Sequence, residues 1–134
     1  DDSGIEVDEL NGAPGIRSAR YAGDSASDAD NTAKLLLGLS TTETDNRQAR
    51  FRCEVVFVRH KLDASPVICS GTWVGRIAET PRGENGFGYD PVFLVGNGQK
   101  SAAELSAEEK NRISHRGQAL AQLVVQLKDL GLGS

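Results

Sequence analysis

The stretch Pro81–Pro91 reads PRGENGFGYDP and runs directly into an apolar segment, Val92–Val95 (VFLV). Three glycines and two prolines in eleven positions commit this backbone to one irregular path and exclude a helix. Phe87 stands between two glycines, so bare backbone flanks its ring and leaves a face open to a flat ligand. Asp90 precedes a proline, which biases it toward an extended conformation. The loop is typical of a pocket for a heterocycle at the entrance of a strand, or of an ordinary glycine-rich hairpin loop with a core phenylalanine.

Length and composition describe one globular domain. A chain of 134 residues can bury roughly two thirds of its unfolded surface. The net charge of −4 and the pI near 5.1 argue against general nucleic-acid binding, which needs a basic face. No apolar run approaches the ~18 residues of a membrane helix, and no signal peptide is visible. We therefore expect a cytoplasmic protein with no nucleic-acid partner and no membrane contact.

Periodicity predicts strands and helices along the whole chain. Ser27 with Asp30 forms a capping pair for the first helix, and Ser106 with Glu109 forms another for the C-terminal third. The apolar residues of the last helix keep helical spacing, so we expect them to lie in the core. The expected elements are strands over Asp2–Asp8, Phe51–Val58, Val67–Ile77 and Val92–Val95, a helix over Asp24–Leu39, and a helical stripe of Leu120, Leu123, Val124, Leu127 and Leu130.

Two cysteines fall in the two central strands. If the hairpin closes around Asp63, Cys53 faces about Trp73 and Cys69 faces about Phe57, too far apart for a disulfide. Their spacing is not that of a zinc site, so we expect both to be buried, reduced and hydrophobic in character.

The segment Glu108–Gln118 concentrates polar and charged side chains. On one continuous helix, Lys110 would differ from His115 by about 140° and from Arg116 by about 120°, so the three side chains would not converge on a ligand. If the chain breaks near Ile113 and Ser114 caps a second helix, they face one cleft. The other interpretation is a solvated, charged helix surface.

Five motifs, taken together and in order, resemble the inosine triphosphate pyrophosphatase family. They are Asp1-Asp2-Ser3-Gly4, Gly12-Ala13-Pro14-Gly15, Ser18-Ala19-Arg20-Tyr21-Ala22-Gly23, Gly86-Phe87-Gly88-Tyr89-Asp90-Pro91, and Glu109-Lys110-Asn111-Arg112-Ile113-Ser114-His115-Arg116-Gly117-Gln118-Ala119-Leu120. The resemblance implies an α/β fold with an elongated mixed β-sheet flanked by helices, two lobes and a central cleft, of which this chain is the later two thirds. It also implies a homodimer.

The resemblance further implies a reaction and a set of site residues. The family hydrolyses non-standard purine nucleoside triphosphates (ITP, dITP, XTP) with Mg²⁺, giving the monophosphate and pyrophosphate. By motif, Asp2 is the metal-binding carboxylate and catalytic proton acceptor, and Asp1 is a neighbouring metal ligand with a less defined role. The expected substrate-binding residues are Ser3, Phe87, Gly88, Tyr89, Asp90, Lys110, His115 and Arg116. Arg20 and Trp73 stay undecided between the cleft and the scaffold.

These residue types suit a keto-purine. Inosine and xanthosine carry an acceptor oxygen at purine position 6, where adenine carries an amino donor. Donors such as Lys110, His115 and Arg116 would pair with the oxygen and would be left unpaired against adenine. Phe87 can stack on any purine, and Asp90 can accept from purine N1–H.

The sequence departs from the family pattern at its start. It contains no methionine and opens on Asp1, so we expect a processed or truncated end. The Ser/Thr-x-Asn-x-x-Lys loop that grips the triphosphate in the family is missing, and we expect catalysis to need that segment. The alternative functions are a non-catalytic purine-nucleotide-binding module and a related pyrophosphatase with a different base preference.

Overall fold

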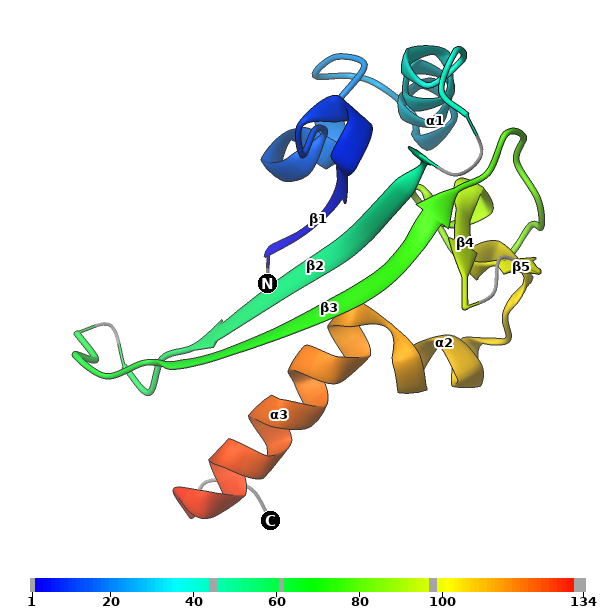
Figure 1. Ribbon diagram of the computed structural model, residues 1–134. Helices are drawn as coiled ribbons and strands as arrows, with labels where there is room; N and C mark the ends of the chain where they lie inside the picture. The colour runs from blue at the N-terminus through cyan, green and yellow to red at the C-terminus, as the bar shows by residue number, and fades with distance from the viewer. Residues whose placement is uncertain (1, 44–45, 61, 97–98, 132–134) are drawn as a thin grey trace.

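Two long strands with alternating side chains form the centre of the molecule, and Figure 1 shows them as one extended hairpin. They are β2 (Gln48–Phe57) and β3 (Val67–Ile77). Along most of both strands the odd-numbered residues are buried and the even-numbered ones are exposed, so only one face of this sheet is covered. The computed structural model describes residues 2–43, 46–60, 62–96 and 99–131.

Five strands make one sheet in the order β1-β2-β3-β4-β5. Each described strand is antiparallel to its neighbours. The other elements, with their bounds, are β1 (Asp2–Val7), η1 (Asp8–Leu10), η2 (Gly15–Arg20), α1 (Asp28–Gly38), η4 (Asp90–Val92), β4 (Phe93–Val95), β5 (Lys100–Ser101), η5 (Ala102–Glu104), α2 (Ala107–Ile113) and α3 (His115–Asp129).

The predicted α/β fold with an elongated sheet and flanking helices is confirmed. α1 lies near one end of the hairpin, and α3 runs alongside it (Figure 1). The sheet was expected to be mixed, but no parallel pairing occurs among the strands described here. Helices and strands are therefore mixed in this chain, whereas strand directions simply alternate.

Capping chemistry fixes where the helices begin. The Ser27 side chain accepts from Asp30 N, and Asp30 in turn accepts from Ser27 N, so α1 begins at Asp28. The sequence predicted this capping pair correctly but started the helix at Asp24, four residues early. The predicted strand at Val92 likewise begins one residue later, because residues Asp90–Val92 form a short 3-10 turn.

The β2–β3 register differs from the predicted one by two residues. Cys53 pairs with Gly71 and Cys69 with Val55, whereas Trp73 faces Phe51. A shift of two keeps every side chain on its predicted face, because strand side chains alternate with a period of two. The expectation for the cysteines is confirmed, since both are free and buried.

The core lies between the covered face of the sheet, α1 and the segments after β3. Its largest fully buried side chains include Phe93, Ile5, Leu35 and Ile77. A smaller cluster lies under α3, where Ala119 and the partly buried Leu123 pack against β2 residues.

The predicted burial of the last helix is wrong for much of its stripe. Leu120 is 41% exposed, Val124 52% and Leu130 49%. The reason is that α3 packs onto the sheet mainly through its first half, around Ala119 and Leu123. None of the described helices combines the length and the apolar character needed to cross a bilayer.

A buried arginine joins α1 to the sheet. Arg47 is only 4% exposed, and its guanidinium donates to four backbone carbonyls, those of Leu39, Thr42, Ile77 and Ala78. These bonds satisfy acceptors at the end of α1 and the end of β3 at the same time.

Candidate active site

One cavity of about 1030 Å³ is lined by β1, η2, α1, the glycine-rich loop and the start of both C-terminal helices. Every residue predicted to bind substrate lines it: Ser3, Phe87, Gly88, Tyr89, Asp90, Lys110, His115 and Arg116. Segments more than a hundred residues apart in the chain therefore contribute to a single hollow. Whether these residues contact a substrate stays a prediction.

Asp90 organises the glycine-rich loop from inside. Its side chain is buried, and its Oδ2 accepts from the Phe87 backbone N–H at 3.0 Å. Gly86 has φ +75°, and a Cβ there would lie 2.2 Å from the same oxygen. The close approach of loop and carboxylate therefore requires glycine at this position.

The same loop is tied to α1. The Gly88 N–H donates to Asp28 Oδ2 at 2.8 Å, and Asp28 also lines the cavity. With Asp90 on one side and Asp28 on the other, two carboxylates fix the backbone on both sides of Phe87. Its ring is 69% exposed, which excludes the core-phenylalanine interpretation and favours the pocket.

Lys110 connects the loop to α2. Its ammonium forms an ion pair with Asp90 and lies 4.4 Å from the centre of the Phe87 ring. A cation over an aromatic face and beside a carboxylate is held by both interactions. The three side chains form one preorganised group at the wall of the cavity.

The chain breaks between α2 and α3 at Ser114. Ser114 ends α2, with its N–H donating to Lys110 O at 2.8 Å, and its hydroxyl accepts from Gly117 N at 3.0 Å to begin α3. A Cβ at Gly117 would lie 1.8 Å from Asn111 O, so the corner is too tight for any larger residue. The conditional prediction of two helices is confirmed, and the corner brings Lys110 and His115 to the same cavity.

His115 is nine-tenths buried and lies flat against Phe51, with ring centres 4.8 Å apart and planes 12° apart. Its Nε2 is 2.7 Å from the Ser3 hydroxyl of β1. Its Nδ1 is buried and finds no hydrogen-bond partner among the described residues. Burial lowers the pKa of His115 to about 4, and Lys110 and Arg116 lower it further while Asp90 opposes them. The imidazole is therefore neutral at neutral pH.

Tyr89 contributes to the scaffold of the site. Its hydroxyl donates to Ser18 O at 2.6 Å, and burial raises the pKa of this phenol above its usual value. Trp73 is buried against Phe51 and Phe93 and belongs to the core. Arg20 is exposed at the end of η2.

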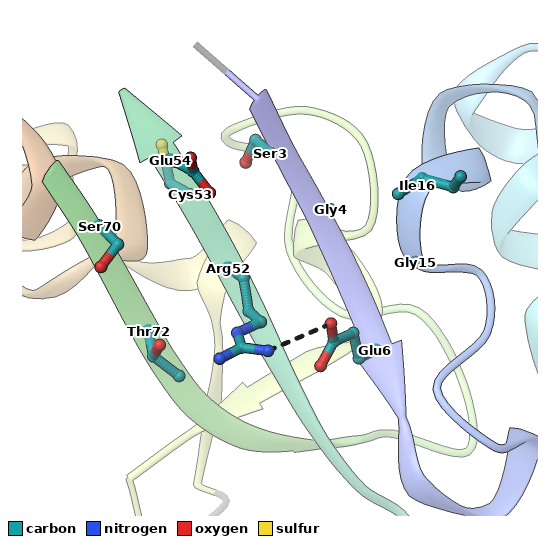
Figure 2. Close-up of a pocket in the computed structure, with 11 residues that line it drawn as sticks. Ser3, Gly4, Glu6, Gly15, Ile16, Arg52, Cys53, Glu54, Ser70 and Thr72 are labelled. Carbon is teal, nitrogen blue, oxygen red and sulfur yellow. Dashed lines mark ion pairs between the residues drawn. The ribbon is translucent and has the colours of Figure 1, made fainter. Parts of the chain in front are cut away.

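A second, smaller cavity of about 390 Å³ lies along β1, β2 and β3. Figure 2 shows Arg52 turned toward Glu6, with their charged groups 3.6 Å apart. Ser3 is the one predicted substrate-binding residue that lines it. The base-side chemistry described above is concentrated in the larger cavity.

The predicted metal and catalytic residues lie at the edge of what is described. Asp1 is outside the described residues, and of Asp2 only the backbone is described, in β1 and opposite Glu54. Among the side chains that the structure does describe, no three of His, Cys, Asp or Glu gather as a metal cluster.

Comparison with known proteins decides the family. The model of the Ham1 family matches residues 1–126. This chain belongs to the Ham1 family. Among its relatives, a Methylococcus capsulatus protein named dITP/XTP pyrophosphatase is 58% identical over 130 residues, covering 97% of this chain and 65% of the relative. A Vibrio cholerae protein of the same name is 51% identical over 129 residues, with 96% and 64% covered.

Solved Ham1 structures share the fold. A HAM1 protein from Coxiella burnetii matches with a TM-score of 0.89 at 49% identity, covering 95% of this chain and 64% of that one. The Staphylococcus aureus Ham1 protein matches with a TM-score of 0.87 at 46% identity, with 96% and 65% covered. The chain thus spans about two thirds of the length of these relatives. These coverages give no support to the prediction that the N-terminal phosphate loop is missing, and it stays a prediction.

Two residues of this Ham1 site carried no sequence signal. Asp28 was assigned only to a helix, because its partner Gly88 is sixty positions away. Asn31 is buried beside the cavity and joins the Ala22 N–H to the Ala19 carbonyl. A buried asparagine inside a predicted helix stripe was the one available hint.

Proposed function

We propose that this protein hydrolyses non-standard purine nucleoside triphosphates, ITP, dITP and XTP, to the monophosphate and pyrophosphate. The observation that supports it best is the meeting of an exposed aromatic ring, Phe87, with Lys110, His115 and Arg116 in one cavity. The relatives named dITP/XTP pyrophosphatase support the same substrate class.

Base choice follows from hydrogen-bond polarity. A carbonyl at purine position 6 accepts from Lys110 or Arg116, which carry only donors. An amino group at that position leaves these buried donors unpaired, and an unpaired polar group costs about 1–3 kcal/mol. The Phe87 ring stacks on either base and contributes affinity rather than choice.

The chemical step takes place at the α-phosphorus. Water attacks it, the bond from the α-phosphorus to the bridging oxygen breaks, and pyrophosphate leaves. We assign Asp2 as the proton acceptor. Its carboxylate, with Asp1 beside it, also offers the hard oxygen ligands that Mg²⁺ prefers. When bound, the cation would neutralise phosphate charge and acidify a water.

We further propose a homodimer in the cytoplasm. Apolar side chains at even positions of the central hairpin are available for such contact, since Val56 is 51% exposed, Ile68 55% and Val74 69%. Light scattering during size-exclusion chromatography tests the dimer, and a monomer at micromolar concentration would contradict it.

The test of the activity compares ITP, dITP and XTP with ATP and GTP as substrates of the purified protein, with products identified by ³¹P NMR. We expect monophosphate and pyrophosphate from the first three only, activity lost with EDTA and restored by Mg²⁺. Release of inorganic phosphate would refute the assignment. Binding of ITP without turnover would instead indicate the non-catalytic binding module.

A further inference from the structure

The edge of β3 beside α3 is closed by side chains instead of a strand. Within the described residues, β4 pairs only with Gly75–Ile77 of β3. Farther along the same edge, Thr72 N donates to Gln118 Oε1 at 3.3 Å, and Gln118 Nε2 donates to Thr72 O at 2.9 Å. One amide thus satisfies the donor and the acceptor of one residue, as a neighbouring strand would.

A second glutamine repeats the contact one helical turn later. Ser70 N donates to Gln122 Oε1 at 3.3 Å. One turn of helix rises about 5.4 Å, and two strand residues span about 6.6 Å, so helix and strand stay in step over this distance. Between them, a Cβ at Gly71 would lie 2.0 Å from His115 O. The first turn of α3 therefore rests directly on the backbone of β3.

Gln118 also reaches the end of α2. Its Nε2 donates to Ile113 O at 3.0 Å, the last residue of that helix. A single side chain thereby joins three elements: the strand, the helix that carries Lys110, and the helix that carries His115 and Arg116. None of these bonds involves an atom that the proposed reaction uses.

We propose that Gln118 is a positioning residue for base recognition: by fixing the α2–α3 corner to β3, it sets where Lys110, His115 and Arg116 stand around the purine. This inference rests on the proposed function. It makes a distinct claim, because the selectivity of the cavity then depends on a contact outside it.

The decisive variant is Gln118→Met, which keeps length and helix propensity but removes the amide. Misplacement of binding groups by about 1 Å can cost on the order of a hundredfold in rate. We expect kcat/KM for ITP to fall by about ten- to a hundredfold, and the ITP-to-ATP ratio of kcat/KM to shrink. Gln122→Met is the matched control, with the ratio unchanged. A folded Gln118→Met protein with the wild-type ratio would overturn the proposal.

Two measurements do not depend on turnover. Ring ¹⁵N shifts of His115 should move in Gln118→Met and stay in Gln122→Met, even if the wild type proves inactive and the proposed function fails. Should Gln118→Met not fold, amide hydrogen exchange of the wild type decides. A Thr72 amide protected from exchange supports the clamp, and one that exchanges like an open edge amide refutes it.

Discussion

Protonation of His115 should destabilise the folded protein below neutral pH. The imidazole is pressed between the Phe51 ring and the Ser3 hydroxyl, and burial lowers its pKa to about 4 from the ordinary 6.5. In the unfolded chain the same group takes up a proton once the pH falls below 6.5. The unfolded state thus binds more protons than the folded state between these two values.

The size of the effect follows from that difference. Each pKa unit corresponds to about 1.4 kcal/mol, so a shift of this size removes about 3 kcal/mol between pH 6.5 and pH 4. The stabilisation is complete above the unfolded pKa and is lost as the pH falls toward the folded one. Against a typical stability of about 5–15 kcal/mol, such a loss is easily measured.

Urea unfolding at steps between pH 7.5 and 5.0 isolates this group. Carboxylates that the fold stabilises, Asp63, Glu104 and Glu109, have pKa values lowered by hydrogen bonds and titrate below the window. The variant His115→Phe should flatten the dependence, whereas His60→Gln serves as the control for removing a histidine elsewhere. Equal slopes for the wild type and His115→Phe would refute the reasoning.

Three further substitutions test other parts of the structure. Arg47→Met leaves four buried carbonyls without a donor, so the free energy of unfolding in urea should drop by about 3 kcal/mol, whereas the control Arg50→Met, at a half-exposed ion pair, should cost under about 1 kcal/mol; equal losses would contradict this. Gly71→Ala pushes the start of α3 away from His115 O and should cost about 2 kcal/mol, and an unchanged denaturation midpoint would exclude that contact. Asp90→Asn keeps the shape but removes the charge facing α2, so calorimetry should find inosine monophosphate bound about tenfold more weakly; wild-type affinity would argue against it.

Local sequence was enough to predict the elements that short-range chemistry determines. The capping pair of Ser27 with Asp30 is formed as predicted, since both members lie within one turn. The break at Ser114 was predicted only as a condition, because a serine can cap a helix or sit inside one. The structure decides it through the tight fit of Gly117 on Asn111, a contact that no spacing rule encodes.

Contacts between distant segments were beyond the sequence. The bond from Gly88 to Asp28 and the clamp of Gln118 on Thr72 each join residues more than forty positions apart. The hairpin register missed by two for a similar reason. An alternating strand specifies which face each residue takes, but the turn specifies which residue it meets.

The position of Lys110 bears on how the proposed selectivity would arise. In the structure its ammonium already has two partners, the Asp90 carboxylate and the Phe87 ring. A purine that stacks on Phe87 competes for the same ring face and takes one partner from the ammonium. A carbonyl at position 6 offers an acceptor in exchange, whereas an adenine amino group offers none. On this argument the cavity rejects adenine because the pairing that it would disturb exists before the substrate arrives.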